Sequence, residues 1–239
     1  MTGLAAIIFD FDGTIADSEP LHLAAFQRTL AEELGLELTE REYTERYLAY
    51  DDRRLFEVLL RDRGRRVPPE QFERLLRVKA AHYGRLAEDP PLLPGAAEMI
   101  QKTSARWPLA LASGALGREV RPVLERAGLL GCFAAIVTAE MVERGKPDPE
   151  SFVLALERLN RKPLGAPPRG KMSPGACLVV EDSVAGVAAA RAAGMRVLAV
   201  TTSYGRDRLR EADRVVASLE EASDPEALAA WFASLPPRG

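Results

Sequence analysis

Short segments that are apolar at nearly every position recur along the chain and constrain its fold more than any other feature. Strands of this kind are buried on both faces, and most of those found here are separated by helical patterns. The sequence therefore predicts an α/β fold in which helices cover both faces of a parallel sheet. The five clear segments are LAAIIF (4–9), PLALAS (108–113), FAAIVT (133–138), CLVV (177–180) and RVLAVT (196–201), and DRVVAS (213–218) is a weaker sixth.

The helices expected between these strands carry signals for their ends. SGALGREVRPVLERAG and DSVAGVAAARAAG finish at Gly128 and Gly194, and glycine is common directly after a helix. In KPDPESFVLALERL, Asp148 suits the N-cap and Pro149 suits the first helical position. These signals fit single helices that connect parallel strands.

The connection between the first and second strands is different, because about 90 residues lie there. A single crossover helix needs far fewer. Apolar residues at helical spacing predict several helices in this stretch, so we expect a discontinuous core of residues 1–16 and 88–239, interrupted by an all-helical domain over 17–87. The residues that carry this periodicity are Leu23, Phe26, Leu30, Leu34, Leu55, Phe56, Leu59, Leu60, Phe72, Leu76 and Tyr83.

Composition narrows the classes of function. The net charge is −3, with acidic and basic residues intermixed, so there is no electrostatic case for nucleic acid or an anionic membrane surface as partner. No apolar stretch approaches the roughly 18 residues of a membrane span, and the N-terminus has no secretory pattern. Cys132 and Cys177 lack metal-type spacing. We expect a cytoplasmic protein, a monomer or weak dimer, with buried, reduced thiols and a surface loop at 160–175.

Polar residues collect where the predicted strands end. In parallel sheets, ligands bind beyond the carboxyl ends of the strands, so these side chains should meet at one edge. Two like charges one residue apart, as in IFDFDGT, repel each other unless a cation lies between them. The residues concerned are Asp10 and Asp12 after the first strand, Ser113 and Gly114 after the second, Lys146 after the third, and Glu181 and Asp182 after the fourth.

This set of residue types points to phosphate chemistry. Carboxylates without histidine or cysteine nearby favour Mg²⁺, which usually also binds a substrate phosphate. Ser113 with the N–H groups of a helix start could bind an anion, and Lys146 could neutralise a phosphoryl group. One aspartate could attack phosphorus to form an aspartyl-phosphate, and the other could act as acid and base. The spacing alone leaves open which of Asp10 and Asp12 is the nucleophile.

Four motifs, in order, resemble those of the haloacid dehalogenase-like superfamily of phosphatases and phosphomutases: FDFDGTIADS, LASG, GKPDP and VVEDSVAG. The resemblance covers essentially the whole chain. It implies a Rossmann-like three-layer core with a helical cap inserted after the first motif. It also implies that Asp10 is the nucleophile and that Asp12 is the acid/base. The remaining implied roles are a Mg²⁺ site made by Asp10, the Asp12 backbone carbonyl, Glu181 and Asp182, and phosphoryl binding by Ser113 and Lys146.

Within the superfamily, the chain is most similar to the branch of β-phosphoglucomutases, phosphoglycolate phosphatases and sugar-phosphate phosphatases. His22 in DSEPLH and Lys79 in RVKAAHY match a histidine and a cap lysine of the mutases. Those mutases carry a GxSRxxS-like segment whose arginine binds a distal phosphate, whereas this chain has AYDDRRLF (49–56). An aspartate falls near the arginine position, and either Arg53 or Arg54 could take the place of the arginine. Asp52 and Arg53 are the candidates for substrate contact there, and the change favours hydrolysis over mutase activity.

The resulting prediction is a Mg²⁺-dependent phosphatase that acts on a small phosphorylated metabolite, either a sugar phosphate or phosphoglycolate. A β-phosphoglucomutase-type sugar phosphomutase is the alternative. A signalling receiver domain also combines acidic residues, a phospho-accepting aspartate and a lysine on a parallel sheet, but receivers are much shorter and lack an inserted helical domain. A non-catalytic protein of the same fold would not need every chemical position to be filled.

Overall fold

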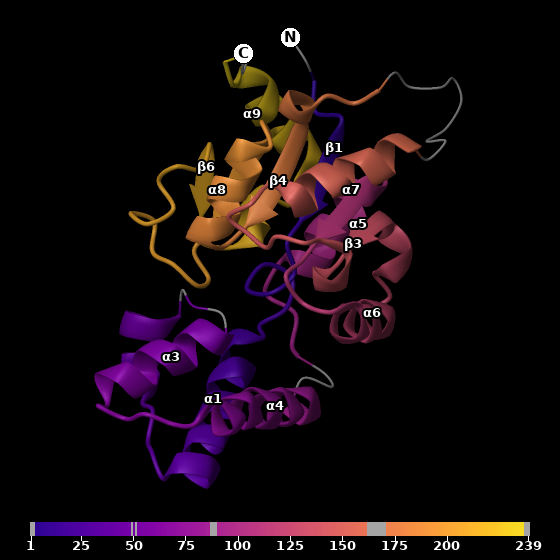
Figure 1. Cartoon of the computed structure of the whole chain (residues 1–239). Helices are drawn as coiled ribbons and strands as arrows, with labels where there is room; N and C mark the ends of the chain where they lie inside the picture. The colour runs from indigo at the N-terminus through magenta and orange to yellow at the C-terminus, as the bar shows by residue number, and fades with distance from the viewer. Residues whose placement is uncertain (1–2, 49, 51, 87–89, 162–170, 237–239) are drawn as a thin grey trace. The chain divides into compact units, whose positions relative to one another are not determined.

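The computed structural model describes residues 3–236 apart from 49, 51, 87–89 and 162–170 (Figure 1). The chain forms two compact units. Met1–Asp17 together with Pro91–Gly239 form one, called the core unit below, and Ser18–Pro90 form the other, called the helical unit. Among the helices described, none combines the length and the apolar character that crossing a membrane requires.

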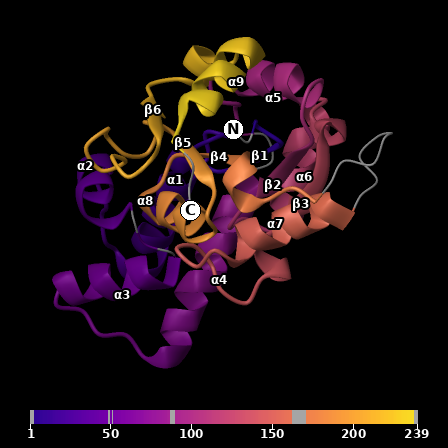
Figure 2. The same cartoon turned by 90° about the horizontal axis from the view of Figure 1, so that it is seen from above.

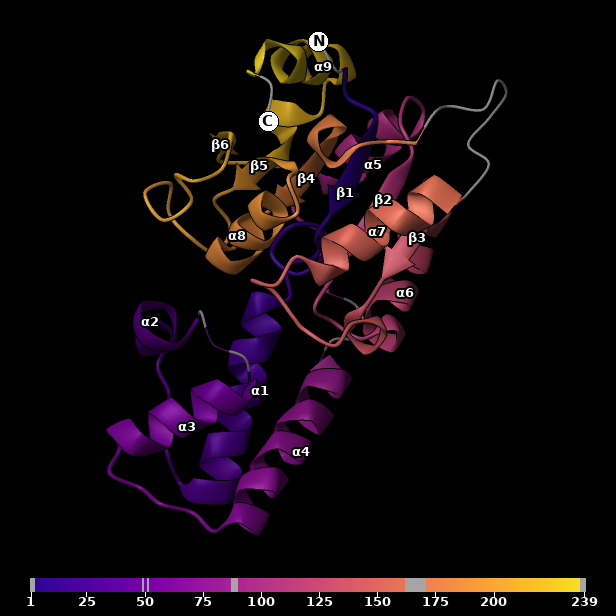
Figure 3. The same cartoon turned by 45° about the horizontal axis from the view of Figure 1, so that its top comes forward.

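A six-stranded parallel sheet organises the core unit, with the strand order β3-β2-β1-β4-β5-β6 (Figure 3). The prediction of a parallel sheet is confirmed, and the weak sixth segment is its last strand. The order reverses beside β1, which pairs with β2 on one side and β4 on the other. The strands are β1 Ala6–Phe9, β2 Leu109–Ala112, β3 Phe133–Val137, β4 Cys177–Glu181, β5 Arg196–Val200 and β6 Arg214–Val216.

Helices cover both faces of this sheet, as the apolar strands predict. Alternate strand residues enter two separate apolar cores: Ile7 and Phe9 belong to one, and Ala6 and Ile8 to the other. The first core is completed by α5 Ala96–Ser104, α6 Gly117–Arg126 and α9 Pro225–Ser234. The second is completed by α7 Glu150–Arg161 and α8 Val184–Ala192 (Figure 2).

The predicted helix ends are confirmed in the core unit. Gly128 and Gly194 have φ of 69° and 76°, in the left-handed region where glycine is favoured. The Asp148 carboxylate accepts a hydrogen bond from the Glu150 N–H at 3.0 Å and so caps α7. Short 3₁₀ turns connect the larger elements at Leu130–Cys132, Ala139–Met141, Pro174–Ala176 and Leu219–Ala222.

The helical unit has its own apolar core. Its elements are α1 Glu19–Leu34, α2 Glu40–Glu42, a π-helical turn over Tyr43–Tyr47, α3 Asp52–Asp62 and α4 Pro69–Leu86. Phe26 packs edge-on against Phe56 with ring centroids 5.3 Å apart, which joins α1 to α3. The other buried members of this core include Leu30, Tyr47, Leu55, Leu59 and Leu75.

Most of the surface loop predicted at 160–175 lies outside the described residues. The described parts on either side are joined by one side-chain amide. Asn160 accepts a hydrogen bond from the Met172 N–H at 2.8 Å and donates one to the Met172 carbonyl at 3.1 Å. This pair fixes the approach to β4 next to the end of α7.

Candidate active site

Asp10 stands at the centre of the site because it directly follows the central strand β1. Its N–H donates to the Val180 carbonyl at 2.9 Å, which extends the ladder with β4 by one residue. The Asp10 side chain is buried, whereas Asp12, in the turn that follows, is half-buried. The two aspartates are thus held at the carboxyl end of the sheet, where the sequence predicts a site.

The turn after β1 approaches β4 closely, and this approach requires glycine. Gly13 has a φ of 69°, and a Cβ built on it would overlap Asp182 Oδ2 and lie 2.7 Å from Asp182 Cγ. Asp182 also accepts hydrogen bonds from the Ser203 hydroxyl and, at 3.5 Å, from the Thr14 hydroxyl. The hydroxyls of Ser203 and Thr14 therefore both hold the Asp182 carboxylate next to the turn that contains Gly13.

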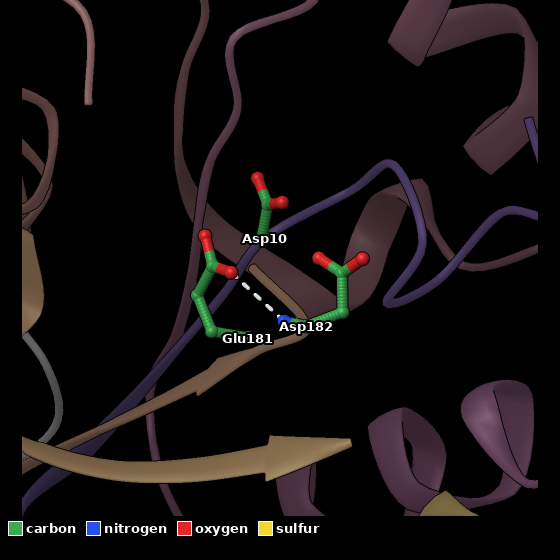
Figure 4. A group of neighbouring side chains, drawn as sticks. All are labelled: Asp10, Glu181 and Asp182. Carbon is green, nitrogen blue, oxygen red and sulfur yellow. Dashed lines mark hydrogen bonds between the residues drawn. The ribbon is translucent and has the colours of Figure 1, made fainter. Parts of the chain in front are cut away.

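Three buried carboxylates gather where β1 and β4 end. Asp10, Glu181 and Asp182 each offer a carboxylate oxygen, and these oxygens lie within 4.8 Å of one another (Figure 4). Glu181 is the last residue of β4. One of its oxygens accepts from the N–H groups of Asp182 at 2.8 Å and Ser183 at 2.7 Å, which orients it at the start of α8.

Lys146 inserts a positive charge between two of these carboxylates. Its Nζ lies 2.7 Å from Asp10 Oδ1 and 2.6 Å from Glu181 Oε1, and 4.8 Å from the centre of the Phe152 ring. The lysine side chain is only 13% exposed. Lys146 lies 35 residues before Glu181 along the chain, and it contacts both Glu181 and Asp10, as its place after β3 predicts.

Burial dominates the electrostatics of the group. It raises the pKa of Asp10 to about 7; the Lys146 ammonium opposes the shift and Glu181 adds to it. Burial, with the charges of Glu181 and Asp10, also raises the pKa of Asp182. Burial alone would lower the pKa of Lys146, but the carboxylates of Asp10 and Glu181 outweigh it and raise that pKa. The carboxylates therefore favour more positive charge than Lys146 alone provides.

The second strand ends at the predicted anion-binding residues, but the helix after them differs from the expectation. Ser113 is buried, and its hydroxyl accepts from the Ala115 N–H at 2.9 Å. The expected N–H groups at the start of α6 are used by the chain itself. Glu119 accepts from the Leu116 N–H, and Glu140 accepts from the Gly117 N–H at 3.0 Å. Of the predicted groups at this position, we expect the Ser113 hydroxyl and the Gly114 N–H to donate to an anion.

In the helical unit, three of the four predicted substrate residues form one cluster. Lys79, on α4, is buried, and its Nζ donates to His22 Nδ1 at 2.8 Å and to Asp52 Oδ1 at 2.6 Å. The same ammonium lies over the rings of Phe26 and Tyr83, at 4.6 and 5.0 Å from their centres. Helices α1, α3 and α4 thus each contribute one polar residue to a shared position.

His22 is neutral in this cluster. Burial, and then the nearby Lys79 ammonium, hold the pKa of His22 well below its ordinary value. Because Lys79 donates to Nδ1, we place the histidine proton on Nε2, which makes that atom a hydrogen-bond donor. His22 also stacks on Tyr83, with ring centroids 4.0 Å apart.

Arg53, the fourth predicted substrate residue, does not join this cluster. Its Nη2 donates to Glu73 Oε1 at 2.8 Å in a pair where both side chains are about half exposed, and its guanidinium lies over the Phe72 ring. Consecutive residues of a helix face different directions, so Asp52 and Arg53 cannot both turn toward Lys79. Asp52 is the residue that does.

Comparison with known proteins identifies the family. The model of haloacid dehalogenase-like hydrolases matches residues 4–194. The chain is a haloacid dehalogenase-like hydrolase. It is 34% identical over 193 residues to the phosphorylated carbohydrates phosphatase of Thermotoga maritima, covering 80% of this chain and 82% of that one. It is 30% identical over 219 residues to the β-phosphoglucomutase of Bacillus subtilis, covering 89% of each.

The fold of this haloacid dehalogenase-like hydrolase is also found among solved structures. The crystal structure of CbbY from Rhodobacter sphaeroides in complex with phosphate is similar with a TM-score of 0.76 and 28% identity, over 94% of this chain and 99% of that one. The similarity in sequence and structure covers both units, because the aligned share exceeds either unit alone. The predicted family and fold class are confirmed.

The buried carboxylates of this haloacid dehalogenase-like hydrolase suit Mg²⁺. The group offers only oxygen atoms, which Mg²⁺ prefers, and it contains no histidine or cysteine that would favour zinc. Burial, and then the neighbouring carboxylates, raise the pKa values of Asp10 and Asp182, so an added cation would favour their ionised forms. Asp10, Glu181 and Asp182 would hold the ion. The Asp12 carboxylate is not a member of this group, and a contribution from its backbone carbonyl stays a prediction.

Sequence reasoning missed three residues that shape the site. Ser203, in the segment after β5, donates to Asp182, and Glu140 caps α6 next to Ser113. Gly186 makes room for Glu181, because a Cβ there would overlap the Glu181 carboxylate. The signal for Gly186 was available in VVEDSVAG, where a glycine follows the acidic pair by a little more than one helical turn.

Proposed function

We propose that the chain is a Mg²⁺-dependent phosphatase that hydrolyses a small phosphorylated metabolite, of the sugar phosphate or phosphoglycolate type, through an aspartyl-phosphate on Asp10. The observation that carries the proposal is the contact of Lys146 Nζ with Asp10 and Glu181 beside Asp182. A buried nucleophilic carboxylate next to a fixed ammonium is suited to a phosphoryl group, whose negative charge the ammonium neutralises.

In the first half-reaction, an ionised Asp10 oxygen attacks phosphorus, and the bond between phosphorus and the ester oxygen breaks. Lys146 favours the ionised form of Asp10, because its ammonium opposes the rise in the pKa of that carboxyl. Ser113 and the Gly114 N–H orient the phosphoryl oxygens. The leaving oxygen takes a proton from the Asp12 carboxyl, so the product alcohol departs neutral.

In the second half-reaction, the ionised Asp12 accepts a proton from water, and the water oxygen attacks phosphorus. The bond between phosphorus and Asp10 breaks, which releases inorganic phosphate and restores both aspartates. When bound by Asp10, Glu181 and Asp182, Mg²⁺ supplies Lewis-acid stabilisation of the negative charge on the phosphoryl oxygens.

We further propose that the helical unit selects the leaving group. With His22 neutral, the Lys79 ammonium and the Asp52 carboxylate balance each other, so the cluster carries no net charge. A neutral, hydroxyl-rich leaving group suits such a cluster better than a second phosphate does. The relative from Thermotoga maritima, named a phosphorylated carbohydrates phosphatase, supports this class of substrate.

A phosphate-release screen with Mg²⁺ tests the proposal on sugar phosphates and phosphoglycolate. Asp10→Asn should abolish release, because the neutral amide is not a competent nucleophile. Asp207→Asn, the same change at an exposed aspartate of the core unit, is the matched control and should keep full activity. Acid quenching during turnover should trap phosphate on the wild-type protein. Activity in Asp10→Asn would contradict the mechanism.

A sugar phosphomutase is the second candidate, and the similarity to the Bacillus subtilis β-phosphoglucomutase favours it. Both reactions share the aspartyl-phosphate, so they differ in the fate of the phosphoryl group. An assay with β-glucose 1-phosphate and a bisphosphate primer separates them. Formation of glucose 6-phosphate without matching phosphate release would favour the mutase and overturn hydrolysis as the main activity.

A further inference from the structure

A groove of about 460 Å³ lies along the outer edge of the sheet in the core unit, outside the carboxylate site. Its floor is formed by Leu130 and strand residues 133–136, and three arginines line it: Arg121 on α6, and Arg158 and Arg161 on α7. Strand β3 is the terminal strand of the sheet, and Figure 3 shows it beside α6 and α7. The volume is in the range of small-molecule sites.

Among the three arginines, Arg158 gives the strongest evidence that the groove binds an anion. It is half-buried, and its Nη1 donates to the Ile136 carbonyl at 2.9 Å and to the Met141 sulfur at 3.1 Å. Both acceptors are neutral, and within the described part of the chain no carboxylate forms an ion pair with Arg158. A partly desolvated guanidinium without a counter-charge is costly, so this position favours an anion.

The other two arginines are available to the same anion. Arg161 pairs with Glu157 at 3.3 Å, but both side chains are more than half exposed, and such surface pairs contribute little. The charge of Arg121 lies near Glu140, whose carboxylate is committed to the N–H of Gly117. No acidic side chain is found among the described residues that line the groove.

The backbone of β3 excludes one common occupant of a sheet edge. An added strand would need the outward carbonyl of Ile136 as an acceptor, but Arg158 occupies it. In a parallel ladder, the N–H and the C=O of one residue face the same side, so the Ile136 N–H also faces outward. The groove therefore offers donors from the backbone and from guanidinium groups, which suits a ligand made of acceptors.

From this arrangement we propose that the groove binds a compact organic anion with at least two phosphate or carboxylate groups. The arginines bind the acidic groups in bidentate fashion, with Arg158 at the base and Arg121 and Arg161 at the sides. Phe133 and Ile136 contact the carbon skeleton. This site is separate from the proposed phosphatase centre, and its occupancy does not require Mg²⁺.

Isothermal titration calorimetry on the full chain tests the proposal, with citrate and pyrophosphate as probes in EDTA. We expect the wild type to bind at least one of them, and Arg158→Gln to weaken that binding at least tenfold. Because Arg158 also supports β3, the exposed pair Arg121→Gln/Arg161→Gln provides a second test and should give the same loss. Arg126→Gln/Arg191→Gln is a control of equal charge outside the groove and should change the affinity less than twofold.

Three results would overturn the proposal. The first is no binding of either probe at millimolar concentration. The second is binding that the Arg121→Gln/Arg161→Gln variant leaves unchanged, because the probe would then occupy another site. The third is binding of hexaglutamate to the wild type without any binding of the two small anions, which would assign the groove to an acidic peptide.

Discussion

Replacing Gly186 with alanine tests whether Glu181 orients the site. Gly186 lies in the first turn of α8, and a Cβ added there would overlap Glu181 Oε1 and lie 2.5 Å from Oε2. The Glu181 carboxylate is fully buried and could make room only by leaving its partners. Those partners are Lys146 Nζ, the N–H groups of Asp182 and Ser183, and the Ser183 hydroxyl.

Two opposing contributions set the expected magnitude. Alanine is favoured over glycine inside a helix by about 1 kcal/mol. Disrupting a buried ion pair costs about 3–5 kcal/mol, because a charge is left without its partner. The cost of disrupting the ion pair is larger than the gain from the helix preference, so Gly186→Ala should lower the free energy of unfolding by about 3 kcal/mol. At roughly 2–4 °C per kcal/mol for a chain of this size, Tm should fall by about 6–12 °C.

Gly84→Ala is the matched control for this substitution. Gly84 also lies within a helix, α4, and a Cβ there would meet no atom within 4 Å. Only the helix preference then acts, so Gly84→Ala should raise Tm by about 2–4 °C. Tm is measured for both variants by circular dichroism, and phosphate release is measured with Mg²⁺. Gly186→Ala should lose at least about a hundredfold in activity, because a displacement of about 1 Å in a catalytic group can cost that much.

A Gly186→Ala protein that gains stability like Gly84→Ala would refute this reasoning. It would mean that the Glu181 carboxylate moves without losing a contact that matters. A variant that is destabilised but fully active would refute only the expected loss of activity, namely the view that displacing the Glu181 carboxylate disturbs the catalytic groups.

Three further predictions concern buried titratable groups. Burial raises the pKa of the Cys177 thiol to about 12. At pH 8, a thiol reagent should therefore label the native chain only at the half-buried Cys132. Labelling that persists in Cys132→Ser would contradict this prediction. The pKa of His22 in the folded protein lies well below the value of about 6.5 expected in the unfolded chain. The unfolded state therefore binds a proton on His22 more readily than the folded state does. The stability that neutral His22 contributes is lost as pH falls below about 6.5. By calorimetry, Tm should therefore fall less between pH 7.5 and 5.5 in His22→Gln than in the wild type, and equal falls would exclude this assignment. Mg²⁺ at about 100 times its Kd should stabilise the wild type by about 2.7 kcal/mol relative to EDTA, and less at pH 6 than at pH 8, because protons on Asp10 and Asp182 compete with the ion. Asp182→Asn should abolish this rise in Tm and Asp207→Asn should retain it; a rise that survives in Asp182→Asn would place the ion elsewhere.

The sheet and the core cluster could be predicted because both follow from order along the chain. Strands buried on both faces have a distinct apolar pattern, and in a parallel sheet every carboxyl end lies at the same edge. Asp10, Ser113 and Asp182 each come directly after a strand, so the topology alone places them at that edge. The contact of Lys146 with Asp10 needed only that the loop after β3 return to the same edge.

Contacts that depend on the register of a helix, or on a turn far along the chain, could not be predicted. Asp52 and Arg53 are adjacent, and which one meets Lys79 depends on where α3 begins, a boundary that AYDDRRLF does not define. Glu140 caps α6 across 23 residues, with no periodic signal linking the two. In the sequence, Gly186 looks like any small residue in an alanine-rich helix. Its role could not be predicted, because that role depends on the direction of the Glu181 side chain.

Charge balance connects these details to the chemistry. Three buried carboxylates, those of Asp10, Glu181 and Asp182, lie beside the buried ammonium of Lys146. Three negative charges against this one positive charge leave two negative charges without compensation when all are ionised. Protons can remove this imbalance, and the raised pKa values of Asp10 and Asp182 reflect that route. A protonated Asp10, however, cannot attack phosphorus. A divalent cation would supply the two missing charges and leave Asp10 ionised, so in the proposed mechanism the ion that neutralises the site would also keep the nucleophile reactive.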